Sequence, residues 1–379
     1  MTTPIRLAGA KIRGAITRSP DTGYFSIAYG NGRFVAVGHQ LGAASGSDAG
    51  DGPAVTAPGA SVSSDGGYTW RDVKLPFFGQ KQIYDRISYR PGFWACSSKW
   101  LRSGVNQHYK LLAQDTPNLD FWNPLFVKPS LGTTVNAWAI LGLDASPDGW
   151  MYAGIAPGPS AGSSYTTNCT TFDARTDASY PAITSTVWTG RRFLLFSQWN
   201  TVATQPGNIA AAYTLPRAVP WGANTASAGW VYDSASDGTN VLCSTTDQRT
   251  AVGQAVPPGK QMWLTKDDGV SWLNYGKLPG VESIESICYT PRLDLWCALG
   301  FDRSNFSSVC FIGKPGMEGG DFSASGGVNK WMERKLPTAV WKAVASDGES
   351  FVAVSQDGYR MVIDLSQQEL NALGVNKKA

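Results

Sequence analysis

The sequence predicts an all-β fold, a seven-bladed β-propeller of four-stranded blades. Three observations predict it. A strand–turn–strand unit recurs seven times along the 379 residues, a second turn motif follows it in the same phase, and a further strand-like segment comes after that motif. Repeats of about 40–50 residues that each hold four short strands are the sequence signature of propeller blades.

The repeating unit is an apolar strand, a tight turn and a second apolar strand. Apolar residues alternate on both sides of each turn, as expected for β-strands. Gly, Asn, Asp and Pro at the turns supply the backbone conformations that a short hairpin requires. The copies span residues 24–38, 84–98, 141–155, 183–197, 230–244, 284–299 and 341–355.

A second turn motif follows the pattern S/T-x-D-x-G-x-S/T-W. In such a turn the aspartate accepts backbone N–H groups, the glycine adopts a conformation that a Cβ would penalise, and the tryptophan covers an apolar blade edge. We therefore expect a structural role, without catalysis, for both copies. Their residues are Ser63, Asp65, Gly67 and Trp70 in the first copy, and Thr265, Asp267, Gly269 and Trp272 in the second.

Outer strands are expected directly after these motifs. The segments 70–76, 272–279 and 331–337 each end in Leu-Pro. Proline is tolerated at the edge of a sheet, where no neighbouring strand needs its missing N–H. These segments therefore supply the fourth strands of their blades.

The chain termini are expected to close the ring. Residues 5–16 would form the outer strand of the last blade, because an open seam would leave an unpaired sheet edge. Residues 1–365 then form a single propeller domain, and residues 366–379 a C-terminal tail or short helix that stops near Gly374.

Composition argues against several functions. A net charge of +3, from 32 basic and 29 acidic residues, does not favour binding to nucleic acid through bulk charge. Two histidines, His39 and His108, cannot build a His-rich metal site, and we expect no metal and no cofactor. Cys96, Cys243 and Cys297 lie in apolar runs and are expected to be buried thiols.

The sequence shows no targeting or membrane segment. The N-terminus lacks the apolar region of a secretory signal, and no run of apolar residues is long enough to cross a bilayer. Synthesis in a cytoplasm without membrane insertion is therefore expected, and release in a virus particle is one route to the outside.

Long connections are expected between the second and third strands of several blades. They are the segments 39–60, 156–164, 198–208 and 246–260, which are rich in small and polar residues. Long loops on a rigid scaffold commonly carry binding. His39, Trp199 and Trp221 are the candidate ligand-facing residues on this loop-rich face, with solvated loops that bind nothing as the alternative.

No catalytic constellation stands out. The six glutamates do not sit beside a tyrosine in an arrangement that suggests a nucleophile pair, and glycosidases otherwise need two carboxylates placed across the scissile bond. The sequence contains no phosphate-binding loop, zinc-protease motif or nucleophile elbow. We therefore expect no enzymatic activity.

The hairpins at 34–38 and 351–355, together with the motif at 63–70, resemble the BNR/Asp-box propellers. In style the chain is similar to phage-encoded virion propellers. The resemblance implies a non-enzymatic tail or tail-fibre protein that acts as a structural adaptor or host-surface binder through its long-loop face.

Expected partners are other virion subunits or a host surface glycan or receptor, within a symmetric oligomeric assembly and without nucleic acid. The alternative is a sialidase-like glycoside hydrolase or a lectin that acts on surface glycans. A third possibility is an intracellular scaffold propeller that binds peptides. The fold hosts many activities, so the resemblance is specific for fold more than for function.

Overall fold

The computed structural model covers the full chain and places the following residues well enough for description. They are 14–41, 58–76, 83–99, 110–119, 122–125, 139–155, 161–167, 173–177, 183–197, 201–206, 219–220, 231–245, 262–269, 273–276, 278, 281, 283–302, 307–314 and 330–375.

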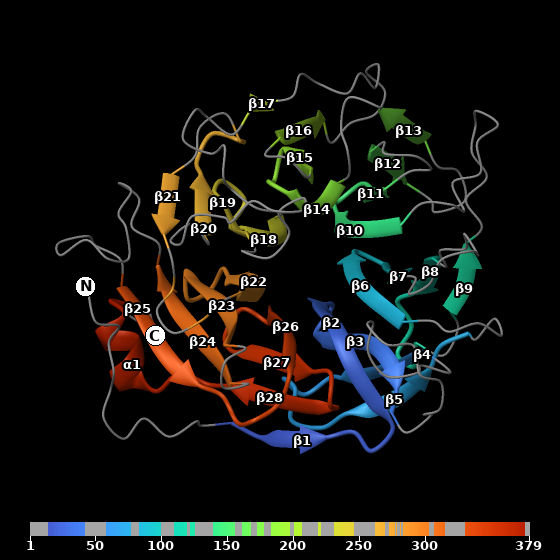
Figure 1. Ribbon diagram of the computed structural model, residues 1–379. Coiled ribbons are helices and arrows are strands. Elements are labelled where there is room, and N and C mark those ends of the chain that lie inside the picture. The colour runs from blue at the N-terminus through green and yellow to red at the C-terminus, as the bar shows by residue number, and fades with distance from the viewer. Residues whose placement is uncertain are drawn as a thin grey trace.

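The strands form seven antiparallel four-stranded sheets arranged in a ring (Figure 1). In six of the sheets the strand order follows the chain, and we call them blades 1 to 6. Blades 1 to 4 contain β2 (Thr22–Gly30), β3 (Arg33–Gln40), β4 (Pro58–Ser63), β5 (Arg71–Lys74), β6 (Ile83–Arg90), β7 (Phe93–Lys99), β8 (Lys110–Gln114), β9 (Trp122–Leu125), β10 (Ala139–Ala145), β11 (Trp150–Ile155), β12 (Ala161–Thr166), β13 (Asp173–Asp177), β14 (Ile183–Trp188), β15 (Arg192–Ser197), β16 (Thr201–Pro206) and β17 (Val219–Pro220).

The last sheet, which we call blade 7, joins the two ends of the chain. Its order is β1-β28-β27-β26, so a strand from the N-terminal region is its outer strand. The remaining strands are β18 (Val231–Ser236), β19 (Val241–Thr245), β20 (Met262–Thr265) and β21 (Leu273–Gly276) in blade 5, β22 (Ser283–Thr290), β23 (Leu295–Asp302), β24 (Ser307–Lys314) and β25 (Lys330–Lys335) in blade 6, and β26 (Trp341–Ser346), β27 (Phe351–Ser355), β28 (Tyr359–Ile363) and β1 (Ile16–Arg18) in blade 7.

Two parts of the sequence prediction for the blades need correction. The closing strand is Ile16–Arg18 rather than residues 5–16, of which 5–13 lie outside the described residues. The blades are also not uniform, because β17 has only two residues and pairs with β16 only at Thr201 and Val202. Blade 4 therefore still has four strands, but its outer strand is shorter than those of the other blades.

The predicted connections also need correction in blades 3 and 4. Residues 201–206 form β16, so the segment 198–208 is mostly strand and not a long loop. Residues 161–166 form β12, which shortens the predicted loop 156–164. The strand residues in both segments, 161–166 and 201–206, are mostly small or polar, which is why the sequence suggested loops.

The core lies between neighbouring blades. One cluster joins Tyr24 and Phe34 of blade 1 to Val352 and Val362 of blade 7. Others join blades 1 and 2, blades 4 and 5, and blades 5 and 6 in the same manner. Burial of apolar area between blades is the main force that holds such a ring together.

Each inner strand carries one β-bulge at an equivalent place. A bulge inserts one extra residue, which bends the strand and increases its twist. We call the residue that directly follows the bulged one the post-bulge position. It is occupied by Ser26, Arg86, Gly142, Ser185, Asp233, Ser286 and Ala343 in blades 1 to 7.

A short C-terminal helix, α1 (Gln367–Ala372), packs beside blade 6. Ser366 and Glu369 form a capping box at its start, and Gly374 follows its end with a φ of +73°. Glu369 is buried against Arg334 of β25 and pairs with it. No helix among the described residues is long and apolar enough to span a membrane.

Candidate functional site: the central cavity

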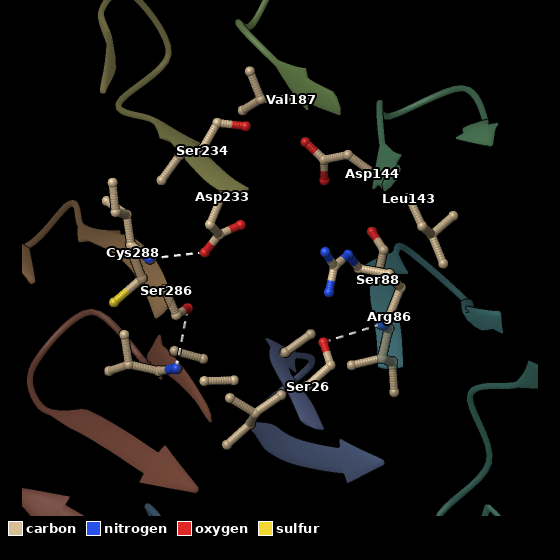
Figure 2. Close-up of a pocket in the computed structure, with 18 of the residues that line it drawn as sticks. Ser26, Arg86, Ser88, Leu143, Asp144, Val187, Asp233, Ser234, Ser286 and Cys288 are labelled. Carbon is tan, nitrogen blue, oxygen red and sulfur yellow. Dashed lines mark hydrogen bonds between the residues drawn. The ribbon is translucent and has the colours of Figure 1, made fainter. Parts of the chain in front are cut away.

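The inner strands of all seven blades line a cavity of about 480 Å³ at the centre of the ring. Figure 2 shows the side chains that converge on it from different blades. A volume of several hundred Å³ is typical of small-molecule sites. The cavity is therefore the place where the described part of the chain could hold a ligand.

Post-bulge side chains connect three pairs of neighbouring blades, namely 1 and 2, 5 and 6, and 6 and 7. Ser26 Oγ accepts a hydrogen bond from Ile87 N at 3.3 Å, across the junction of blades 1 and 2. Asp233 Oδ2 accepts from Ile287 N at 2.8 Å, and Ser286 Oγ from Val344 N at 3.3 Å. An acceptor at this position thus bonds to a backbone N–H of the neighbouring inner strand.

Blades 3 and 4 are joined by a different side chain, which makes an equivalent hydrogen bond to the neighbouring inner strand. Gly142 occupies the post-bulge position of blade 3 and has no side chain to offer. Two residues later, Asp144 Oδ2 accepts a hydrogen bond from Trp188 N of blade 4 at 2.6 Å. The carboxylate therefore takes over the connecting role that post-bulge serine or aspartate has at the junctions of blades 1 and 2, 5 and 6, and 6 and 7.

Three charged side chains face one another in the cavity. Arg86, Asp144 and Asp233 come from blades 2, 3 and 5, and Figure 2 shows all three pointing toward the middle of the ring. Like charges that share a poorly solvated space disfavour ionisation. The positive charge of Arg86 acts on Asp233.

Burial and charge shift both carboxyl groups. Burial raises the pKa of Asp144 to about 6, and the negative charge of Asp233 adds to this, whereas the N–H groups of Trp188 and Ala145 oppose it. Burial also raises the pKa of Asp233, and the positive charge of Arg86 opposes it. A carboxyl group with a pKa near 6 exchanges its proton close to neutral pH.

The other charged pair in the lining is self-contained. Lys342 Nζ lies 2.9 Å from Glu285 Oε2, and Ser283 Oγ donates to Glu285 Oε1 at 2.9 Å. This glutamate is 8 % exposed. Because its charge is neutralised and its oxygens are bonded, Glu285 is not available as a nucleophile.

The first S/T-x-D-x-G-x-S/T-W turn has the hydrogen bonds that the sequence suggested. Asp65 accepts from the N–H groups of Tyr68 and Thr69 at 3.1 and 2.9 Å, and Ser63 Oγ accepts from Gly67 N at 2.9 Å. Trp70 is half-buried, donates to Gly67 O at 2.7 Å and lies under the guanidinium of Arg360 of blade 7. Asp65 is therefore occupied as a turn-forming residue.

The second turn is similar where it is described. Thr265 Oγ1 donates to Asp267 Oδ1 at 2.8 Å and accepts from Gly269 N at 2.9 Å. The neighbouring Asp268 is buried and lies 3.0 Å from Arg191 of blade 4. Trp272 lies outside the described residues.

The candidate ligand-facing residues do not form a described site. His39 belongs to β3 and is 1 % exposed, so its assignment to a loop is wrong. Burial lowers the pKa of His39 to about 4, and the charge of Asp357 partly opposes this. Trp199 and Trp221 lie outside the described residues.

The cysteine predictions are confirmed where the structure describes them. Cys96, Cys243 and Cys297 are free and fully buried. Within the described ranges, no group of three or more His, Cys, Asp or Glu side chains could hold a metal ion.

Sequence reasoning missed the central cavity residues. Asp144, Asp233 and Arg86 lie in the first strands of predicted hairpins, and nothing in those hairpins marked these residues as part of a site. A signal was present nonetheless, because Ser-Ile-x-Tyr recurs at 26–29 and 286–289, with Arg-Ile-Ser-Tyr at 86–89. Alignment of the seven hairpins on this motif would have placed Arg86 and Asp233 at the same strand position and Asp144 two residues further along.

Comparisons with known proteins bear on the fold. No family model and no curated protein sequence matches the chain. Among solved structures, the WD40 β-propeller domain of Doa1 matches with a TM-score of 0.58 and 10 % identity over 94 % of this chain and 97 % of that one. A chain of the mitotic checkpoint complex matches with a TM-score of 0.60 and 9 % identity over 97 % and 100 %.

The WD40 domain of Neurospora crassa Pan2 is similar as well, with a TM-score of 0.59 and 8 % identity over 93 % of this chain and 95 % of that one. Identities this low carry no information about ligands or activity, because one fold hosts unrelated functions. The chain is thus a β-propeller whose solved structural neighbours include WD40 propellers.

Proposed function

We propose that this protein is a non-enzymatic binding propeller that docks its partner through the face formed by the second-to-third strand connections. The supporting observation concerns the opposite face of the ring. There, hydrogen bonds and ion pairs join the short turns of neighbouring blades. Because the polar groups of these turns are hydrogen-bonded or ion-paired with one another, this face offers few groups for a partner to bind.

The contacts on that turn face run from blade to blade. Arg33 of blade 1 pairs with Asp115 of blade 2 and donates to Thr116 O at 2.6 Å. Arg90 of blade 2 donates to Asp148 O of blade 3 at 2.7 Å. Further contacts of this kind join Arg191 to Asp268, Arg292 to Glu349, and Tyr68 to Asp364.

The context we propose for this docking is a bacteriophage virion, at the tail or tail fibre. Support comes from the resemblance of the sequence to BNR/Asp-box propellers and from its similarity in style to phage-encoded virion propellers. The partner is then a neighbouring virion subunit or a surface glycan or receptor of the host.

Mass spectrometry and immunogold labelling of purified particles test the context. The expected result is the protein in the particle with label at the tail. Absence from the particle would remove the virion proposal.

Attachment of two variants to particles that lack the protein tests the docking face. Replacement of residues 42–57 by a Gly/Ser linker of equal length should reduce attachment at least about tenfold. Arg292→Ala, on the turn face, should leave it unchanged, because this exposed ion pair contributes little. Equal loss in both variants would contradict docking through the loop face.

A sialidase-like hydrolase or lectin is the alternative, and the pKa of about 6 at Asp144 is the observation that favours it. General acids in glycosidases have raised pKa values of this kind. Hydrolysis of a fluorogenic sialoside that is lost in Asp144→Asn and retained in Asp148→Asn would establish the alternative. We expect no turnover.

A further inference from the structure

Three thiol groups form a row across three neighbouring strands of blade 6. Cys288 on β22 lies directly opposite Cys297 on β23. Cys310 on β24 is the diagonal neighbour of Cys297, because its direct strand partner is Leu299. All three thiols pack in the apolar core between blades 6 and 7. One face of blade 6 thus brings together three groups that can be oxidised.

Two of these thiols are close to the spacing of a disulfide. The Sγ atoms of Cys297 and Cys310 lie 3.1 Å apart. A disulfide joins sulfur atoms about 2.0 Å apart, so the two atoms need to approach by only about 1 Å. Cys243 of blade 5 is equally buried, but the only influence on its pKa among the described residues is burial, which raises it. Cys243 therefore provides an internal control.

A buried guanidinium group lies beside the same pair of thiols. Arg334 on β25 is the direct strand partner of Cys310 and pairs with Glu369 through Nη2. Its Nε and Nη1 atoms have no hydrogen-bond partner among the described residues. Burial raises the pKa of Cys297, and the hydrogen bond with Cys297 together with burial raises that of Cys310, whereas the charge of Arg334 opposes both shifts. Arg334 thus favours the thiolate, which is the nucleophile in disulfide exchange.

Access to the row of thiols is through Cys288. This residue is partly exposed and lines the central cavity (Figure 2). Cys297 and Cys310 are 0 % exposed, so a dissolved oxidant reaches them only by way of a neighbouring thiol. Cys288 is that neighbour, because its thiol is hydrogen-bonded to the thiol of Cys297. A cavity of about 480 Å³ easily admits a molecule as small as hydrogen peroxide.

We propose that Cys288, Cys297 and Cys310 form a thiol relay, through which a peroxide produces a buried disulfide between Cys297 and Cys310. Hydrogen peroxide converts the Cys288 thiol to a sulfenic acid and releases one water molecule. The Cys297 thiol condenses with this sulfenic acid, which releases a second water molecule and forms a Cys288–Cys297 disulfide. Cys310 then attacks the sulfur of Cys297, and the proton that Cys310 loses goes to the departing Cys288 thiolate. In sum, two thiols are oxidised and one peroxide is reduced to two water molecules.

Peptide mapping without reduction tests the proposal, which goes beyond the proposed docking function and needs no partner. The folded full-length chain is treated with hydrogen peroxide, alkylated in urea and digested with trypsin. Cleavage after Arg292 and Arg303 places the three thiols of the relay on different peptides. We expect a Cys297–Cys310 linkage, with Cys243 recovered as an alkylated thiol. Recovery of all three relay thiols in alkylated form, or oxidation of Cys243 at the same rate, would overturn the proposal.

Three serine variants assign each thiol to its step. Cys288→Ser should slow formation of the buried disulfide at least about tenfold, because only this thiol meets the peroxide. Cys310→Ser should stop the relay at the Cys288–Cys297 disulfide. Cys297→Ser should leave Cys288 as a sulfenic acid, which dimedone labels. Cys243→Ser, the matched control in blade 5, should form the buried disulfide at the unaltered rate.

Three outcomes of the variant series would contradict the relay. Unchanged oxidation in Cys288→Ser would mean that peroxide reaches the buried pair directly. Equal slowing in Cys243→Ser would indicate a general effect of core substitutions, and a Cys288–Cys297 disulfide that persists in the unaltered chain would exclude Cys310. Urea unfolding checks that each variant is folded, and Cys288→Ala, which adds no hydroxyl to the core, replaces Cys288→Ser if that variant is not.

Discussion

At the residue scale, the carboxyl group of Asp144 has two roles that conflict. It accepts the N–H of Trp188 and so connects blades 3 and 4, and it does so in a cavity that it shares with Asp233. The connection needs an acceptor, whereas burial penalises the charge that makes the acceptor strong. The raised pKa is the result of this conflict.

The conflict predicts a pH dependence of stability. The pKa of Asp144 is raised from 3.8 to about 6, so its stabilising contribution is fully present below pH 3.8 and is lost as the pH rises through 6. Relative to Asp144→Asn, the unaltered chain should therefore lose about 1–3 kcal/mol of unfolding free energy between pH 4 and pH 7. Urea unfolding of both proteins across this range measures it, and a difference that does not vary with pH would contradict the assignment.

At the scale of single elements, the β4–β5 turn depends on two adjacent glycines that differ in their surroundings. Gly66 and Gly67 have φ values of +78° and +94°, which L-residues rarely adopt. A Cβ on Gly66 would meet nothing closer than 3.6 Å, but a Cβ on Gly67 would lie 2.8 Å from Val352 of blade 7. The same turn therefore fixes both a backbone conformation and a blade junction.

The two glycines provide a matched pair of substitutions. Gly66→Ala should cost about 1 kcal/mol, the usual cost of a left-handed conformation with a Cβ. Gly67→Ala should cost about 2–3 kcal/mol, because steric overlap with the blade 7 core is added to that cost. Thermal and urea unfolding of the two variants measures the difference, and equal losses would show that blade 7 yields at this contact.

At the scale of the whole molecule, the ring depends on a short strand from the other end of the chain. In blade 7, β1 pairs with β28 over three residue pairs, from Ile16 with Met361 to Arg18 with Tyr359. The hydrogen bonds from Val362 N to Ala15 O and from Ser19 N to Gly358 O, each 3.0 Å long, extend this pairing. Without β1, the edge of β28 would be open to other chains.

Two truncations test this closure. Removal of residues 1–18 deletes β1 and should lower the unfolding free energy by about 3 kcal/mol or more and promote aggregation. Removal of residues 1–13 keeps β1 and should have a clearly smaller effect. Urea unfolding and light scattering distinguish them, and equal behaviour of the two truncations would mean that β1 does not hold the ring closed.

The sequence by itself determined the all-β propeller repeat, the inner hairpins and the role of Asp65, because these follow from local periodicity and turn chemistry. The structure alone decided the length of the closing strand, the two-residue outer strand of blade 4 and the burial of His39, since each depends on partners distant in the chain. It also decided the grouping of Arg86, Asp144 and Asp233, which lie up to 147 residues apart (86 to 233). Their proximity, and the raised pKa values of Asp144 and Asp233, come from the closed ring, which no single repeat contains.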